Sequence, residues 1–360
     1  MSNFDLSALA LAAVCPGNEI LYDDKGMPSI MVKIPKMTYA QLGVGESNAV
    51  HPAFIVNGQE VDAIYISKYQ NIVQNGRAYS LPAQDPRANV TFDKAVEYCT
   101  AKGDGWHLVT RAEWAMLALW CKKNGFLPWG NNDYGKDACE TNYKAIPTYH
   151  PEVRTCRVAT GTGPLKWSHD GTPAGIWDLN GNVSEWVGGM RTVYGEIQVL
   201  ANNNAADSSH SLAATGVEWM AIDATTGEFI EPNGNGTTAN SLKLNWGNSV
   251  WTWSTNIPVD ETGTYLGCTF ENVKVDDTVS ADAQRVLQLL GLYKHDETAG
   301  AYEGDSFYAD CTAAERCFHC GGSWTSGANA GVFYLSGSRG RSGSDIRVGF
   351  RSAFVKLPTA

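Results

Sequence analysis

Hydrophobic residues recur every three or four positions in three segments, the spacing of an amphipathic helix. The first helix is predicted between Thr91, which can cap its start, and Gly103, which can end it. The second begins within HLVTRAEWAMLALWCKK, where Thr110 and Glu113 form a capping box. The third follows Ser280, and its apolar face holds Ala283, Val286, Leu287 and Leu290.

Alternating and β-branched runs predict strands elsewhere in the chain. Examples are MVKI (31–34), AIYI (63–66) and WTW (251–253), each within reach of turn-forming residues. Residues 190–310 are rich in Asn, Thr, Gly and Ser, and turn sequences such as NGNG separate their aromatic strands. We therefore expect an α+β fold in which residues 190–310 form an insertion or an elaborated subdomain.

Charge and cysteine content narrow the function classes. The 360 residues carry a net charge of −11, which argues against a nucleic-acid partner or an anionic membrane surface. The nine cysteines are scattered, and an odd number leaves at least one unpaired. Cys317 and Cys320 form one CxxC without a second pair nearby, so free or buried thiols are favoured over a metal site.

The N-terminal stretch LSALALAAVC (residues 6–15) is similar to a short signal core that ends at a cysteine. No Lys or Arg precedes it, and Val14 is large for a cleavage site. Ten apolar residues are also too few to span a bilayer. We expect a packed helix or strand here, no signal peptide and no membrane insertion.

The segment GIWDLNGNVSEWV (175–187) gathers polar residues between apolar anchors. Asn182 and Glu185 could donate oxygen ligands to a structural calcium ion. The alternative, which we favour, is that both side chains satisfy buried backbone groups in a tight corner.

Several motifs together indicate a family. IYISKYQ, HLVTRAEW, PWGNN, GIWDLNGNVSEW, GGSW and RVGFR occur in the order seen in formylglycine-generating-enzyme-like domains, which the chain resembles over residues 30–189 and 311–360. The resemblance implies a C-type lectin-type fold. Residues 1–29 are then an N-terminal segment and residues 190–310 an inserted subdomain.

The enzymes of that family bind copper through two cysteines that follow the GGS-aromatic motif. The matching positions here are Ser326 and Gly331, and neither can act as a soft metal ligand or a redox group. The resemblance therefore implies the scaffold without this catalysis and without a cofactor. An oxidase of this type with altered chemistry remains an alternative.

Residues 321–354 resemble the variable region of retroelement-diversified proteins, including phage tropism determinants. In that family, mutation of template adenines turns AAC or AAT codons into codons for Ser, Thr, Tyr, Asp, Gly, Arg or Ile, but not for Lys, Glu, Gln, Met or Trp. Apart from Trp324, which belongs to the constant motif, none of these five types occurs in residues 321–354. A Ser- and Gly-rich loop would also lack them, which is the alternative explanation.

This resemblance divides the region into constant and variable positions. The constant core positions are expected at Trp324, Val332, Phe333, Leu335, Val348, Phe350 and Phe354, with turns at Gly321, Gly322 and Gly331 and loop anchors at Arg341 and Arg351. The variable, ligand-binding positions are expected at Thr325, Ser326, Tyr334, Ser336, Gly337, Ser338, Arg339, Gly340, Gly343, Asp345, Ile346 and Arg347, on one exposed face. Among these we expect Tyr334, Arg339, Asp345 and Arg347 to make the main contacts; partial burial is the alternative for Tyr334.

The function implied is binding of a protein or glycan receptor on a host cell surface. Weak single sites favour a homo-oligomer or a multivalent array, such as a phage tail tip. The expected location is the virion, after synthesis in the bacterial cytoplasm. A lectin of fixed specificity, with a calcium-bound sugar site, is a further alternative.

Overall fold

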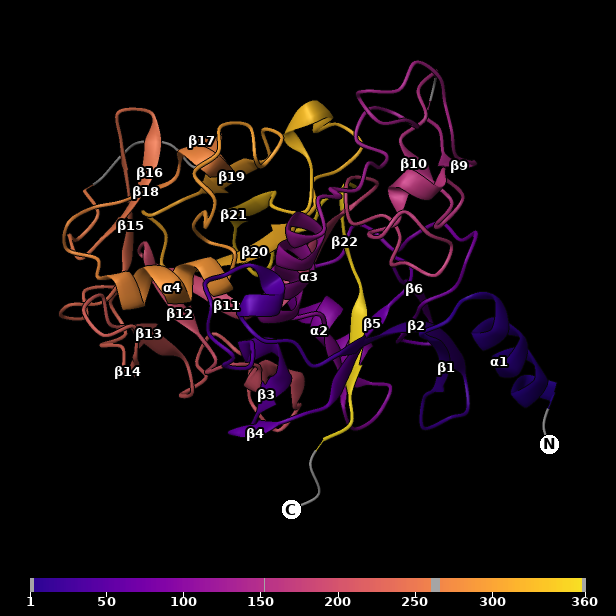
Figure 1. Cartoon of the computed structure of the whole chain (residues 1–360), viewed down its shortest axis with the longest axis horizontal. Coiled ribbons are helices and arrows are strands. Elements are labelled where there is room, and N and C mark those ends of the chain that lie inside the picture. Colours follow the sequence, from indigo (N-terminus) through magenta and orange to yellow (C-terminus); the bar gives the residue numbers. More distant parts are fainter. Residues whose placement is uncertain (1–2, 152, 260–265, 358–360) are drawn as a thin grey trace.

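The computed structural model describes residues 3–151, 153–259 and 266–357. Helices lie against two large sheets, so the α+β prediction is confirmed (Figure 1). The α-helices of the described residues are α1 (Asn3–Val14), α2 (Phe92–Thr100), α3 (Arg111–Lys123) and α4 (Ala281–Leu289).

Three of these helices begin where the sequence predicts. The side chain of Thr91 accepts the Lys94 amide of α2, and the side chain of Ser280 accepts the Ala283 amide of α4. The capping box of α3 is complete, because Thr110 accepts the Glu113 amide and Glu113 accepts the Thr110 amide. Local hydrogen bonding therefore fixes the start of each helix.

The N-terminal helix α1 is less packed than expected. Leu6, Leu9 and Val14 are 62%, 64% and 74% exposed, and within residues 6–15 only Cys15, after the last turn, is buried. The prediction of a packed element is therefore wrong, since α1 lies at the edge of the molecule beside the edge strand β1 (Asn18–Tyr22; Figure 1). In the part of the chain that is described, no helix is long and apolar enough to span a membrane.

One sheet has five strands in the order β1-β2-β5-β23-β8. It joins both ends of the chain, because β23 from the C-terminal region lies between β5 and β8. The bounds are β2 (Pro28–Pro35), β5 (Ala63–Ser67), β8 (Trp106–Leu108) and β23 (Ser352–Val355).

The second sheet has twelve strands and runs β17-β19-β21-β20-β11-β12-β15-β16-β18, with β13, β14 and β22 attached at the side. Its first half comprises β11 (Ser184–Val193), β12 (Glu196–Val199), β13 (Met220–Ile222), β14 (Phe229–Ile230), β15 (Lys243–Gly247) and β16 (Val250–Ser254). Its second half comprises β17 (Leu266–Thr269), β18 (Lys274–Val275), β19 (Ser306–Ala309), β20 (Arg316–Cys320), β21 (Leu335–Arg339) and β22 (Val348–Phe350). Strands from residues 190–310 thus extend the same sheet that holds the C-terminal region.

Three short hairpins complete the strands of the described residues. They are β3 (Ile55–Val56) with β4 (Gln59–Glu60), β6 (Ile72–Gln74) with β7 (Arg77–Tyr79), and β9 (Pro147–Tyr149) with β10 (Arg157–Val158). None of the nine cysteines, all of which lie in the described residues, forms a disulfide, and Cys317 and Cys320 are buried thiols, as expected for that CxxC.

Candidate ligand-binding site

Residues 321–354 alternate between buried and exposed stretches. Six of the seven predicted core positions are buried: Trp324, Val332, Phe333, Leu335, Val348 and Phe350. Phe354 is half-buried, with its ring centroid 5.1 Å from that of Trp106. The constant positions therefore fix the segment at both ends of each exposed stretch.

The longer exposed stretch is the variable loop, which we define as residues 339–347. Three of its carbonyl oxygens accept amides from outside the loop: Arg341 from Phe92 (3.1 Å), Asp345 from Asn89 (2.9 Å) and Arg347 from Ser184 (2.8 Å). Because the backbone supplies every acceptor, these bonds do not depend on which side chains the loop carries. These three contacts are therefore available to the loop whatever side chains it carries.

A second exposed stretch, residues 325–329, is held in the same way. Tyr134 donates its amide to the Trp324 carbonyl at 3.0 Å, and Gly327 donates to the Asn132 carbonyl at 2.9 Å. Thr325 is exposed, and Ser326 is partly exposed. Both stretches of the region are therefore anchored to loops of residues 86–92 and 131–134 or to the start of β11.

Three predicted contact residues interact with one another in the variable loop. Arg339 and Arg347 both donate to Asp345 at 2.9 Å, and the side chain of Arg347 is 44% exposed. Hydrogen bonds from Arg347 hold the pKa of Asp345 well below its usual range, although partial burial opposes the shift. Asp345 is therefore ionised at neutral pH and orients two cations at the surface.

Part of the predicted exposed face is buried instead. Ser336 and Tyr334 are 0% and 5% exposed, and Gly337 is also buried, so the prediction of exposure is wrong for these three. Ser336 and Gly337 are buried because β21 is an interior strand, paired with β19 on one side and β20 on the other, and Tyr334 directly precedes that strand. Burial, the alternative considered for Tyr334, is the observed state.

The glycines of the segment serve two purposes. Gly321 and Gly322 have φ values of +85° and +71°, which confirms the predicted turns. Gly331 also begins a turn, because its carbonyl accepts the Tyr334 amide at 3.0 Å, but its φ lies outside this left-handed region, so the turn itself does not require glycine. A Cβ at Gly331 would lie 2.1 Å from a carboxylate oxygen of Asp305, and close approach is therefore the reason for glycine.

Both predicted arginine anchors are confirmed. Arg341 donates to Glu315 at 2.8 Å and to the Leu212 carbonyl at 3.0 Å. Arg351 is fully buried and forms two 2.6 Å hydrogen bonds to Glu185. Arg341 thus fixes the variable loop, and Arg351 fixes the strand that follows it.

Asn182 satisfies buried backbone groups, the alternative that we weighed against calcium binding, whereas Glu185 pairs with side chains. Asn182 accepts the Val158 amide at 2.9 Å and donates to the Val158 carbonyl at 3.1 Å. Glu185 accepts from Arg351 and, at 2.9 Å, from Gln70. In the part of the chain that the structure covers, no group of three His, Cys, Asp or Glu is placed to hold a metal ion. Calcium binding stays a prediction.

The positions that match the family's copper-binding cysteines do not fit a metal. Ser326 accepts the Ser323 amide at 3.0 Å through its hydroxyl group. Gly331 has no room for a side chain beside Asp305. These residues offer neither a thiolate nor space for one, so no copper chemistry is derived for this site.

Several residues that shape the site could not be singled out from the sequence. Asp305 accepts the Phe333 amide at 2.7 Å, and burial raises its pKa to about 8 even though this hydrogen bond works in the opposite direction. Arg157 reaches the Ile346 carbonyl at 3.4 Å. Both lie outside residues 321–354, and no local motif marks either one.

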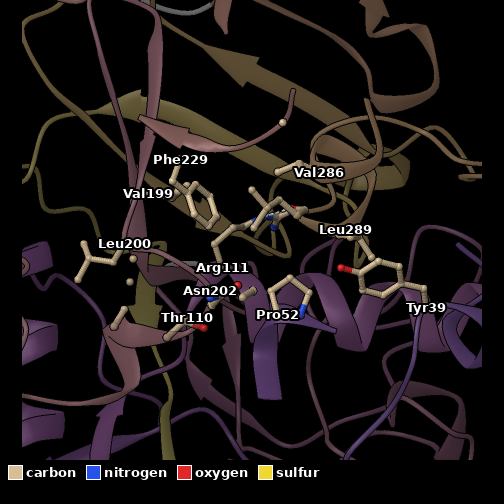
Figure 2. A pocket seen from close by; sticks show the side chains of 16 residues that line it. Tyr39, Pro52, Thr110, Arg111, Val199, Leu200, Asn202, Phe229, Val286 and Leu289 are labelled. Atoms are coloured by element: carbon tan, nitrogen blue, oxygen red, sulfur yellow. Dashed lines mark hydrogen bonds between the residues drawn. The ribbon is translucent and has the colours of Figure 1, made fainter. Parts of the chain in front are cut away.

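A separate apolar cavity of about 160 Å³ lies between α3, α4 and β12 (Figure 2). Arg111 extends into the middle of its lining and donates to the carbonyls of Leu290 and Gly291 at 2.8 and 2.6 Å. These carbonyls end α4, where the helix dipole is negative, so Arg111 joins α3 to residues 190–310. No described residue of the segment 321–354 lines this cavity.

Comparisons with solved structures find similar but distant chains. Treponema denticola variable protein 1 is 12% identical, with 95% of this chain and 100% of that chain covered and a TM-score of 0.33. PvdO from Pseudomonas aeruginosa is 12% identical, with 95% and 99% covered and a TM-score of 0.30. The Major Tropism Determinant U1 variant is 12% identical, with 94% and 71% covered and a TM-score of 0.29.

No curated protein matches the sequence. The sulfatase-modifying factor enzyme 1-like domain, in contrast, matches over residues 17–242, which is more than half of the chain. The match includes the helices α2 and α3 and the three residues whose amides hold the variable loop, Asn89, Phe92 and Ser184, and it extends into residues 190–310. The chain therefore belongs to the family of sulfatase-modifying factor enzyme 1-like domains.

Proposed function

We propose that the chain is a ligand-binding protein whose residues 321–354 are diversified by a retroelement, and that it recognises a receptor on a host cell, as a phage component. The observation that carries the proposal is the support of the variable loop through its own carbonyl oxygens. Such support lets side chains change without changing the backbone, which is what a diversified binding site requires.

The exposed variable residues suit recognition. Arg339, Asp345, Ile346 and Arg347 offer charge, hydrogen bonding and apolar contact on one loop. A pre-organised loop loses little conformational entropy on binding, which favours affinity. Tyr334 and Ser336 are excluded from direct contact in this proposal because both are buried.

We infer that binding is not accompanied by catalysis. The two positions at which the family's oxidases carry cysteine hold Ser326 and Gly331. A retained oxidase activity would require a different metal-binding group. Copper binding or turnover of a cysteine peptide by the purified protein would support that alternative instead.

A single small site of this kind gives weak affinity, on the order of micromolar. Presentation of several copies would raise the apparent affinity by about a hundredfold or more. A homo-oligomer or a multivalent array on a virion is therefore part of the proposal. Sedimentation of the purified chain and its detection in phage particles test this part.

The main experiment compares two display libraries of the full chain. One is randomised at the exposed variable positions Thr325, Ile346 and Arg347 and at the partly exposed positions Arg339 and Asp345. The other is randomised at exposed positions elsewhere, namely Glu46, Thr225, Glu231, Asn235 and Ala239. Both are selected on intact cells of several bacterial strains.

Enrichment of strain-specific binders from the first library alone is the expected result. Equal enrichment from both libraries would contradict the proposed site. The coding DNA offers an independent test, because the proposal requires a reverse-transcriptase gene nearby and an adenine-rich second copy of the segment. A genome with neither would contradict diversification by a retroelement.

A further inference from the structure

A hollow of about 330 Å³ lies directly beside the variable loop. Its lining includes Asp85, Arg87, Tyr149 and Arg157, which lie outside residues 321–354, together with Ile346 from the loop. We call the four outside residues the fixed wall. A ligand that touches Ile346 therefore meets side chains that diversification does not change.

Arg157 is the rigid part of the fixed wall. It forms two hydrogen bonds to Asp85, at 2.9 and 2.8 Å, and its guanidinium group lies 4.4 Å from the ring centre of Tyr149. Its third nitrogen reaches the Ile346 carbonyl at 3.4 Å, and the side chain is only 12% exposed. The pair of charges and the stacked ring thus hold one side of the hollow in place.

Arg87 is the available part of the fixed wall. The residue is exposed at the rim of the hollow. Within the described residues, its side chain forms no ion pair and no hydrogen bond, whereas Arg157 is matched by Asp85. The guanidinium group of Arg87 is therefore available as a hydrogen-bond donor for a carboxylate.

The charge around the hollow differs from that of the whole chain. Four arginines, at positions 87, 157, 339 and 347, are opposed by the two aspartates Asp85 and Asp345. The chain as a whole carries −11. A local excess of positive charge attracts an acidic group of a partner. The rest of the molecule, which is acidic, repels such a group.

Apolar contact is available next to these charges. Ile346 is 46% exposed, and Ile72, Val73 and Ala88 also line the hollow. One face of the Tyr149 ring is covered by Arg157, so a sugar ring has less aromatic surface for stacking. An acidic residue followed by an aliphatic or aromatic residue in a protein segment fits this combination better than a sugar acid does.

We propose that the fixed wall is a constant subsite that binds an acidic side chain of a protein ligand, while the neighbouring apolar residue of that ligand contacts Ile346. The proposal rests on the function proposed above and adds the ligand class. Arg87 binds the carboxylate, Arg157 and Tyr149 form the rigid wall, and the variable loop selects among ligands that share this acidic group.

The test uses a random peptide library displayed on phage, selected on the immobilised full chain. Enriched peptides are expected to share Asp or Glu beside a large apolar residue. Arg87→Glu is expected to weaken their binding at least about tenfold, since an attractive contact becomes repulsive. Lys274→Glu makes the same charge change at an exposed position of β18 and is expected to leave binding unchanged.

The outcomes separate this inference from the proposed function. Binding that is lost in Arg347→Ala but kept in Arg87→Glu would leave the variable site intact and overturn the constant subsite. Binding unaffected by either change would overturn both. Enriched peptides without an acidic residue, or binding of acidic glycans but of no peptide, would also overturn the inference. Arg87 forms no side-chain bonds within the described fold, so the variant is expected to fold, and its melting curve checks this.

Discussion

Strand β21 and the variable loop are the two halves of the variable segment. Neither half contains Lys, Glu, Gln, Met or Trp, but they lie in different environments. In β21, Ser336 is fully buried between neighbouring strands, whereas in the variable loop Arg347 is 44% exposed. The strand is held by its place inside the sheet, and the loop is held by its carbonyl oxygens. Tolerance of side-chain substitution therefore depends on how the backbone is held in place, and not on how polar the residues are.

The largest expected effect concerns the frame that both halves share. Arg351→Leu leaves the Glu185 carboxylate buried with only Gln70 as a remaining side-chain partner. Loss of one member of a buried ion pair lowers the free energy of unfolding by about 3–5 kcal/mol. Chemical denaturation measures this loss. The double change Arg351→Leu with Glu185→Leu is expected to be less destabilising, and an equal loss would contradict the ion-pair explanation.

A second test compares the halves directly. Gly337→Val places a Cβ 2.4 Å from the ring of Phe318, and overpacking of this kind costs about 1–3 kcal/mol of stability. Gly340→Val in the variable loop is the matched control, because the nearest atom to its Cβ is 3.7 Å away. Thermal and chemical unfolding compare the two variants. Equal losses would mean that strand and loop do not differ in tolerance.

The pH dependence of the free energy of unfolding tests the raised pKa of Asp305. Burial raises its pKa to about 8 in the folded chain, while an unfolded aspartate titrates near pH 4. Between these values the folded state holds the proton and the unfolded state releases it, so the stability contribution of Asp305 falls as pH rises. Relative to Asp305→Asn, the wild-type chain is expected to lose about 1 kcal/mol between pH 6 and pH 7. Parallel curves for the two proteins would contradict the raised pKa.

The smallest expected change in stability follows from a substitution in the variable loop. Arg347→Ala removes an exposed side chain while the Arg347 carbonyl still accepts the Ser184 amide. The free energy of unfolding is expected to change by no more than about 0.5 kcal/mol. Chemical denaturation measures it. A loss of several kcal/mol would show that the Asp345 cluster supports the loop, and the contrast with β21 would then disappear.

The sequence predicts what local chemistry decides. The capped helices and the buried positions Trp324 and Phe350 follow from spacing and residue type, and both are confirmed. The burial of Ser336 is not predictable in this way, since it depends on strands from residues 306–309 and 316–320 that enclose β21. Asp305 and Arg157 meet the segment only in three dimensions. Polar composition alone therefore overestimates the exposed face.

The contact between Gly337 and Phe318 has a consequence for evolution. Were codon 337 rewritten together with those of the loop, most of the resulting chains would carry a side chain where the ring leaves no space. Such chains would be removed by misfolding before any ligand could test them. In the proposed diversification the fold would thus act as a first filter, and the fraction of variants that fold would depend on the space beside this ring.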